Sequence, residues 1–263
     1  MDIVTLRDFY ASALGRRVQE TLCAQLNLCW PDLVDKRVMG LGYALPYLSA
    51  LRKRTQLCFA CMPAAQGASP WPDSEKVATA LVFEEDLPLP DVSIDCILLV
   101  HALEYTENAR ETLNEIWRVL TPNGRLVVIV PNRRSIWARN DRTPFGYGQP
   151  YSRQQVVRLF EETNFTPGSV QEIVHYTPSS GYASRLFLCL YEPFIRHLFP
   201  YFGGLLMCQA QKRIYQGSFL QRRQSRRIFI PALSPQACKR SILSCSDLIA
   251  NKEKVVSKLF LQQ

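Results

Sequence analysis

Along the chain, short runs of consecutive apolar residues alternate with stretches in which apolar residues return every three or four positions. The runs are typical of strands buried on both faces of a sheet, and the stretches are typical of amphipathic helices. The clearest unit is residues 95–132, with a strand over 97–100, a helix around 113–120 and a second strand over 126–130. This order of elements predicts an α/β domain with a mostly parallel sheet, in which ligands bind at the carboxyl ends of the strands.

The same periodicities, together with clusters of Pro, Gly and Ser, predict the other elements. We expect helices at 5–28, 46–51, 154–163 and 183–199, and strands at 37–39, 55–60, 78–82, 170–176 and 204–211. Residues 63–74 and 132–153 have loop composition, and a loop as long as the second is usually functional or mobile. Beyond residue 217 the sequence has poor periodicity until 245–261, a stretch that favours one terminal helix.

The net positive charge of the chain comes from its C-terminal part. The net charge is +8, but residues 212–263 carry 11 Lys and Arg against two Asp and Glu, so the preceding part of the chain is close to neutral. Paired basic residues such as those at 222–223 and 226–227 are able to bind phosphates without sequence preference. A solvated tail is the commoner meaning of such a segment.

Composition excludes several classes of protein. No apolar run approaches the roughly 18–20 residues of a transmembrane helix, and the first residues contain an early acid, so we expect no membrane span and no signal peptide. The nine cysteines are odd in number and scattered, which favours reduced, buried thiols in a cytoplasmic protein. The pair Cys58 and Cys61 has no second pair at zinc-finger spacing, and only three histidines are present, so we expect no metal site.

One motif points to the kind of domain. The pattern E-x-x-R-V-L-x-P-x-G over residues 115–124 ends the helix of the 95–132 unit and leads into the following strand. This unit resembles the fourth strand, helix and fifth strand of class I S-adenosylmethionine-dependent methyltransferases, and is most similar to their type 11 small-molecule group. Asn123 stands where that group has a glycine, and asparagine tolerates the left-handed backbone of such a turn.

The resemblance, which covers residues 34–165, implies a Rossmann-like methyltransferase fold. That fold is α/β, with a mostly parallel seven-stranded sheet, an antiparallel edge hairpin and helices on both faces. We therefore expect an N-terminal helical cap in residues 1–32, the methyltransferase domain in 33–217 and a basic, partly disordered appendage in 218–263. The implied cofactor is S-adenosylmethionine, and the implied substrate is a small molecule.

The resemblance also implies which residues contact the cofactor. The segment Gly40-x-Gly42-x-Ala44 stands where the family has its glycine loop, in which missing side chains let the backbone approach a ligand. Gly40 replaces an acid, Phe83 replaces the acid beside adenine, and residues 59–63 lack the acid that holds the ribose, for which Gln66 or backbone amides are the substitutes. The implied contact residues are Gly40, Leu41, Gly42, Tyr43, Ala44, Met62, Phe83, Glu84, Glu85 and His101.

His101 is the candidate catalytic residue, because it follows the fourth strand and an imidazole titrates near neutral pH. Packing beside the cofactor is the alternative role. In the family, the substrate pocket lies between the N-terminal helix and the loop after the fifth strand, where arginines suit a carboxylate or a phosphate. The candidates there are Tyr10, Arg133, Arg134, Trp137, Tyr147 and Tyr151, with Asn132, Arg139 and Phe145.

Several functions remain open from the sequence. The first is methyl transfer, which depends mainly on holding nucleophile, methyl group and sulfur in line and requires no particular base. The second is a methyltransferase-like binding module, motivated by the acids missing at Gly40 and Cys61. The third is association with nucleic acid through the basic tail. A nicotinamide-dependent oxidoreductase is disfavoured, because the G-x-G-x-x-G pattern fails at Leu45.

Overall fold

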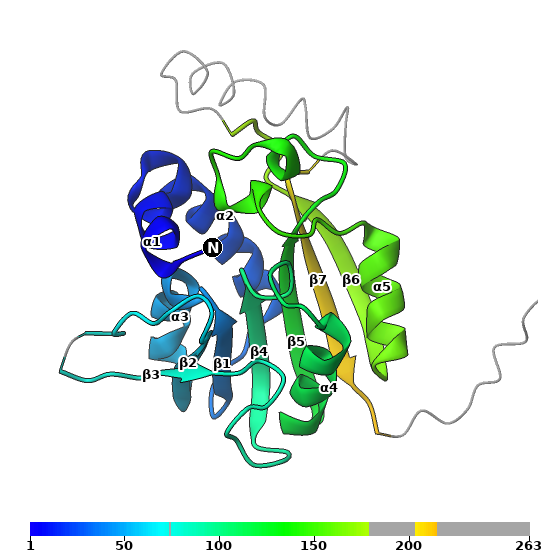
Figure 1. Cartoon of the computed structure of the whole chain (residues 1–263). Coiled ribbons are helices and arrows are strands. Elements are labelled where there is room, and N and C mark those ends of the chain that lie inside the picture. The colour runs from blue at the N-terminus through cyan, green and yellow to red at the C-terminus, as the bar shows by residue number, and fades with distance from the viewer. Residues whose placement is uncertain (74, 179–202, 215–263) are drawn as a thin grey trace, which may run out of the picture. The chain divides into compact units, whose positions relative to one another are not determined.

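The computed structural model describes residues 1–73, 75–178 and 203–214, which are arranged around one sheet (Figure 1). The chain divides into two units, Met1–Gly217 and Ser218–Gln263, and the described residues all belong to the first. The helix expected at 183–199 and the appendage expected at 218–263 lie outside the described residues.

The described part of the chain contains seven strands in the order β3-β2-β1-β4-β5-β7-β6. Strands β1 to β5 are parallel, whereas β7 is antiparallel to both β5 and β6. This topology confirms the predicted fold, including the antiparallel edge hairpin. The strands are β1 (Arg37–Gly42), β2 (Leu57–Pro63), β3 (Thr79–Val82), β4 (Ile94–Val100), β5 (Leu120–Pro131), β6 (Phe165–Ile173) and β7 (Leu205–Lys212).

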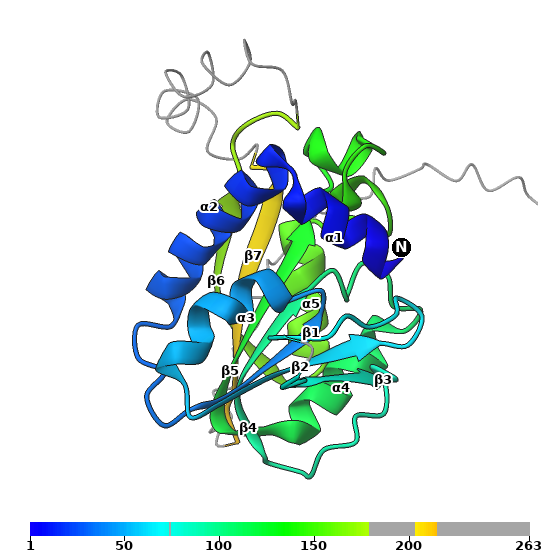
Figure 2. The ribbon, with the colours of Figure 1, turned by 90° about the vertical axis from the view of Figure 1, so that its left-hand side faces the viewer.

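Helices cover both faces of the sheet, as the resemblance implied (Figure 2). Helices α2 (Ala13–Cys29) and α3 (Leu45–Leu51) share one hydrophobic core with the sheet, and α4 (Ala109–Val119) and α5 (Arg153–Glu162) share the other. Adjacent residues of one strand belong to different cores: Val38 packs on the α2 side and Met39 on the α4 side. Burial on both faces is why the strands read as continuous apolar runs.

The N-terminal segment corrects one prediction, because the single helix expected over 5–28 is two helices. Helix α1 (Ile3–Ala11) ends at Ser12, and α2 begins immediately after it. Ser12 has an extended backbone, and its side chain accepts a hydrogen bond from the N–H of Gly15, which makes it the N-cap of α2. Apolar periodicity continues across the break, so it did not reveal the change of direction.

Most strands are longer than their apolar runs. Strand β2 continues to Pro63 instead of ending at residue 60, because its last residues still pair with β3. Strand β5 begins at Leu120, and the predicted turn follows, with Asn123 in the left-handed region at φ 61°. Pairing with a neighbour therefore sets the strand ends, whereas the apolar run marks only the buried centre.

Two connections of the sheet lack a helix. Residues 64–73 and 75–78 lead from β2 to β3, and residues 83–93 lead from β3 to β4, without helical structure in the described positions. Helix α1 and two 3₁₀ turns, η2 (Trp137–Arg139) and η3 (Pro144–Gly146), lie instead at the end to which β4 and β5 point (Figure 1). Among the described residues, none of the helices has the length and apolarity needed to cross a membrane.

Candidate functional site

The carboxyl ends of β1 and β4 lie side by side, with Gly42 paired to Val100. Both strands leave the sheet through a left-handed residue, Gly42 at φ 82° and His101 at φ 54°. For glycine this conformation costs little, whereas for histidine it is uncommon and strained. Strain of this kind at the end of a central strand is often associated with function.

Gly42 is required by the packing of the two strands themselves. A Cβ atom at this position would lie 2.3 Å from the carbonyl oxygen of Val100. Gly40 is equally constrained, since its Cβ would lie 2.6 Å from the Cβ of Ala44. The absence of side chains at both glycines therefore allows this loop to pack closely against neighbouring parts of the chain. A larger residue at position 42 would disturb the fold as well as the binding of any ligand.

Two polar side chains contact the buried imidazole of His101, and a third is linked to it through Tyr10. The Tyr10 hydroxyl of α1 lies 3.0 Å from Nε2 of His101 and 2.8 Å from the hydroxyl of Tyr47 in α3. On the other side of the ring, Nδ1 lies 3.2 Å from Oε1 of Glu104, and both side chains are fully buried. The Phe145 ring of η3 covers the imidazole, with centroids 4.5 Å apart.

Burial governs the titration of the phenols in this cluster. Desolvation raises the pKa of Tyr10 far above its ordinary value, and the nearby Glu104 carboxyl adds to the shift. Desolvation likewise raises the pKa of Tyr47, with Tyr10 as the second cause. Both hydroxyls therefore stay protonated at neutral pH and are able to donate hydrogen bonds.

Gln66 connects three elements above the glycine loop. The side-chain NH₂ group of Gln66 donates to the carbonyl oxygen of His101. The main-chain carbonyl oxygen of Gln66 accepts a hydrogen bond from the N–H of Ile3 at the start of α1. In the described part of the chain, the Oε1 atom of Gln66 is buried and has no hydrogen-bond partner. The same holds for the carboxyl oxygens of Glu104, because the contact with His101 is close but poorly aligned for a hydrogen bond. Unpaired acceptors thus gather around His101, where a buried polar group without a partner is costly.

The structure brings together part of the predicted site. The β1 loop, Met62, His101 and Tyr10 meet at the carboxyl ends of the strands. Phe83 lies at the end of β3 with 72% of its surface exposed, and Glu84 and Glu85 form the turn that follows it. These three residues are therefore the open, outer part of the predicted cofactor contacts.

The predicted substrate residues are also divided between buried and exposed positions. Trp137 is buried and donates to the carbonyl oxygen of Tyr176, while the hydroxyl of Tyr151 donates to that of Leu103. Arg133, Arg134 and Tyr147 are exposed. In this arrangement Tyr10 and Phe145 contact His101 directly.

Tyr47 was missed by sequence reasoning, although it contributes one of the hydroxyls of the cluster. The available signal was a phenol within the mostly apolar helix Leu45–Leu51, because a buried tyrosine hydroxyl must find a polar partner. Among the described residues, no group of three or more potential ligands is placed to hold a metal ion. Burial raises the pKa of the Cys58 and Cys61 thiols to about 11, so this pair consists of unreactive core thiols.

Comparison with known proteins identifies the domain. Residues 37–128 match the methyltransferase domain model Methyltransf_11. A stretch of 56 residues is 39% identical to the ubiquinone/menaquinone biosynthesis C-methyltransferase UbiE of Methylococcus capsulatus, and the match spans 21% of this chain and about a quarter (23%) of that enzyme.

Solved structures share the fold at low sequence identity. A methyltransferase of Thermotoga maritima has a TM-score of 0.56 at 16% identity, over 79% of this chain and 94% of that one. A Haloferax volcanii methyltransferase, solved with the activator Trm112, has a TM-score of 0.54 at 18% identity, over 78% and 96%. The [4+2]-cyclase SpnF has a TM-score of 0.53 at 16% identity, and the match covers 74% of this chain and 80% of SpnF.

The matched segment includes β1 to β4, α4 and the first part of β5, and so contains the Gly42–His101 junction. The SpnF likeness shows that this fold also supports a reaction named as a cyclisation, so the fold does not by itself determine the chemistry. Residues 37–128 thus match a methyltransferase domain, and the chain shares the fold of solved S-adenosylmethionine-dependent methyltransferases.

Proposed function

We propose that the protein transfers a methyl group from S-adenosylmethionine to a small-molecule acceptor. The observation that carries the proposal is the match over residues 37–128, which contains both strands whose ends meet at Gly42 and His101. When bound, the cofactor supplies a methyl group activated by a positively charged sulfur. The acceptor is not specified by the described residues, and the enclosure of His101 by α1 and η3 favours a small one.

The residues around His101 offer hydrogen-bond acceptors and a carboxylate, which suit the hydroxyl groups and the positive charge of this cofactor. The unpaired Oε1 of Gln66 follows β2, where the family holds the ribose hydroxyls, and supplies an acceptor in place of the missing acid. The unpaired carboxyl oxygens of Glu104 suit a cationic group, because a buried carboxylate needs a counter-charge or hydrogen-bond donors. The backbone of residues 40–44, Met62 and Gln66 would hold the cofactor.

Binding also requires part of the cluster to open. Gln66 reaches from the β2 side to the carbonyl oxygen of His101, and thereby crosses the end of β1, which lies between β2 and β4. In addition, the Tyr10 hydroxyl forms a hydrogen bond with Nε2 of His101. We infer that α1 moves away from the strand ends when a ligand enters, which frees both groups together because Ile3 is bonded to Gln66.

Once Tyr10 has moved, Nε2 of His101 is free to accept a proton from the acceptor. Glu104, 3.2 Å from Nδ1, would hold the imidazole in orientation and stabilise its protonated form. Proton removal is needed only for an acceptor that is protonated in the bound state; the larger part of the rate would come from alignment of the reacting groups.

Calorimetric titration of the full chain with S-adenosylmethionine and S-adenosylhomocysteine tests the proposal. We expect saturable binding, with an added stability of about 2.7 kcal/mol when the ligand is at 100 times its dissociation constant. Gln66→Leu should weaken binding, whereas Gln154→Leu, an exposed position in the first turn of α5, should not. The absence of binding at millimolar ligand would reject the enzyme and favour the binding module.

The opening of α1 has its own test in the rate of ligand association. Tyr10→Phe removes the hydrogen bonds to His101 and Tyr47 but keeps the ring in the core. If α1 must move, S-adenosylhomocysteine should associate faster with this variant than with the unmodified protein in stopped-flow measurements. Equal rates would show that the ligand enters without displacing Tyr10, and would leave the proposed function intact.

The binding-module alternative is favoured by one observation, the close packing of the chain's own side chains around His101. The nucleic-acid alternative depends on a basic tail outside the described residues. It predicts RNA or DNA binding that weakens steeply with salt and disappears when the chain is truncated after Gly217.

A further inference from the structure

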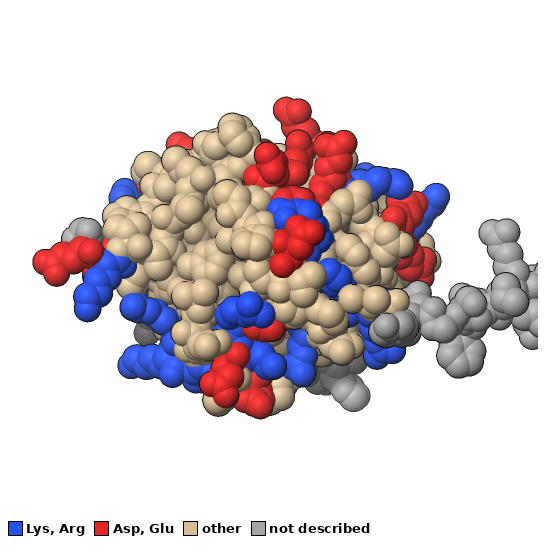
Figure 3. Space-filling model, turned by 90° about the horizontal axis from the view of Figure 1, so that it is seen from below, with Lys and Arg blue, Asp and Glu red and all other residues tan. Residues whose placement is uncertain are grey.

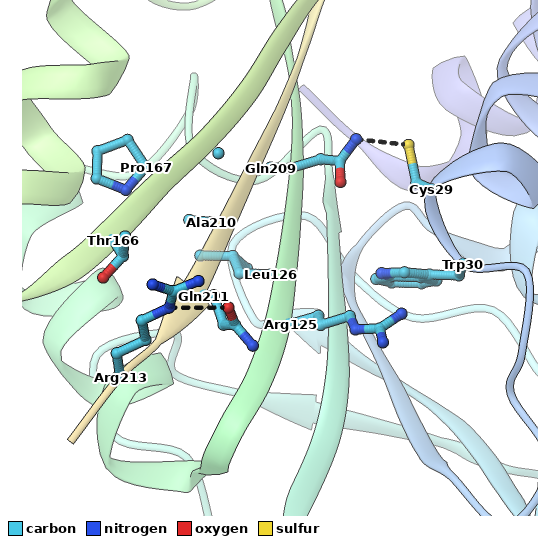
Figure 4. Close-up of a pocket in the computed structure, with 11 residues that line it drawn as sticks. Cys29, Trp30, Arg125, Leu126, Thr166, Pro167, Gln209, Ala210, Gln211 and Arg213 are labelled. Atoms are coloured by element: carbon cyan, nitrogen blue, oxygen red, sulfur yellow. Dashed lines mark hydrogen bonds between the residues drawn. The ribbon is translucent and has the colours of Figure 1, made fainter. Parts of the chain in front are cut away.

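A hollow of about 330 Å³ lies beside Arg125 (Figure 4). Arg125 pairs with Cys96 near the start of β4, so the hollow is toward the opposite end of the sheet from His101. It is bordered by the end of α2 and by the antiparallel strands β5, β7 and β6. We call it the arginine groove, and define it by Cys29, Trp30, Arg125, Gln209, Gln211 and Arg213. His101 follows the end of β4, so most of that strand separates the groove from the candidate site.

Strand register explains why polar side chains face this hollow. Arg125 pairs with Gln211 of β7, and Gln211 pairs with Thr166 of β6, so the three residues form a row across the sheet on one face. Gln209 lies two residues before Gln211 and therefore faces the same way. This is the face covered by α2, because Val127, which pairs with Gln209, packs in the α2-side core.

The end of α2 is what leaves the row uncovered. Earlier in β7, Leu205 and Met207 point to the same face and are buried in the α2-side core. Helix α2 ends at Cys29, and from Gln209 onward the residues on this face are polar and partly open to solvent. The sequence of β7 thus changes from apolar to polar at the point where the helix ends.

Among the described residues that line the groove, two are arginines and none is acidic. Nε of Arg213 donates to Oε1 of Gln211 at 3.2 Å, a neutral acceptor. Within the described ranges, neither Arg125 nor Arg213 forms an ion pair, whereas Arg37 pairs with Asp95 and Arg118 with Glu115. Two guanidinium groups in one hollow without a carboxylate are suited to an anion.

The wall of the groove is held in place, while the arginines are exposed. The ring of Trp30 is buried, and the amide of Gln209 donates to Sγ of Cys29 at 3.0 Å and to Oγ of Ser169 at 2.8 Å. Figure 4 shows Arg125 of β5 and Arg213, which follows the end of β7, on opposite sides of Gln211. A preformed wall with adjustable charged groups fits a small ligand with an anionic end.

The same end of the sheet is basic beyond the groove. Strand β1 begins at Arg37, and η1 (Arg52–Arg54) precedes the start of β2. Seen from this end, Lys and Arg side chains gather along one border of the molecule (lower in Figure 3), interrupted by a few acidic residues. A field of this sign raises the local concentration of anions.

We propose that the arginine groove binds a small anionic ligand through a phosphate or carboxylate group held by Arg125 and Arg213. The volume of the hollow lies at the lower end of the range for small-molecule sites, about 300–1,000 Å³. The proposal does not depend on S-adenosylmethionine or on His101, so it stands or fails separately from the proposed function.

Calorimetric titration of the full chain at constant ionic strength tests the groove, with inorganic phosphate, adenosine 5′-monophosphate and succinate as probes. The double variant Arg125→Gln/Arg213→Gln should weaken binding of the preferred anion by about tenfold or more. The control, Arg16→Gln/Arg142→Gln, removes the same charge from exposed positions elsewhere and should bind as the unmodified protein does.

The probes also distinguish the two anion classes. Preference for phosphate and the monophosphate over succinate would assign the groove to phosphates, and the reverse would assign it to carboxylates. Equal weakening in test and control variants would show that only general charge attracts the anions, and would overturn the proposal. The absence of binding by all three probes at millimolar concentration would overturn it as well.

Discussion

The two ends of the sheet are built from the same strands, but polar side chains are buried at one end and exposed at the other. At the carboxyl ends of β1 and β4, helix α1 and η3 cover the strand ends, and His101 and Tyr47 are fully buried. Toward the amino end of β4, where Arg125 pairs with Cys96, α2 stops short, and Arg125 stays exposed beside a hollow. The difference shows that crossing elements, rather than the sheet, decide whether polar atoms are dehydrated.

The two ends should therefore respond to different perturbations. The covered end depends on close packing and on hydrogen bonds among neutral groups, which are sensitive to lost volume and to alkaline deprotonation. The open end depends on exposed charges, whose individual contributions are small and screened by salt.

The largest expected effect comes from removing the ring that covers His101. Phe145→Ala should lower the free energy of unfolding by about 3–5 kcal/mol, because it leaves a cavity between His101 and Trp137. Tyr147→Ala is the matched control, since its ring is only two residues away but 47% exposed, and should change stability by at most about 0.5 kcal/mol. Urea unfolding measures both, and similar losses would show that the covered end is not closely packed.

The next effect is a loss of stability in alkali. Burial raises the pKa of Tyr10 in the folded state, so its contribution is present below the unfolded value, near 10, and is lost as the pH rises above it. The slope should reach about 1.4 kcal/mol per pH unit for each such tyrosine.

Unfolding experiments at increasing pH check this, with Tyr10→Phe expected to reduce the slope and Tyr147→Phe, at the exposed position, expected to leave it unchanged. If Tyr10→Phe had the slope of the unmodified protein, the Tyr10 hydroxyl would have to be accessible to solvent.

The smallest expected effect concerns the open end in acid. Burial alone would raise the pKa of Asp95, but hydrogen bonds from Arg37 outweigh it, and the pKa is lowered. The stability from this pair is present above the unfolded value, near 4, and is lost as the pH falls. Asp95→Asn should cost about 1 kcal/mol at neutral pH and reduce the loss on acidification. Equal acid sensitivity of variant and unmodified protein would assign that loss to other carboxyl groups.

The individual strands and helices were predictable because their determinants are local, whereas the edge hairpin was implied by the family resemblance. Pro122 and Asn123 mark the turn within β5, ahead of its apolar run, and Asn123 adopts the left-handed conformation that the sequence allowed. The break at Ser12 was not predictable, because apolar periodicity continues through it and the cap depends on a single hydroxyl. The surroundings of His101 were predicted in part: Tyr10 and Phe145 were candidates on the basis of resemblance, whereas Tyr47 was not.

By itself, the sequence determined the α/β class, because apolar runs and turn residues act over short distances, and a motif within it pointed to the kind of domain. Only the tertiary structure decided what lies beside His101 and beside Arg125. Tyr10 and Gln66 are brought to His101 from 91 and 35 residues away, and Gln211 is brought to Arg125 by strand register. Such contacts depend on where helices end and strands pair, and no local pattern in the chain records them.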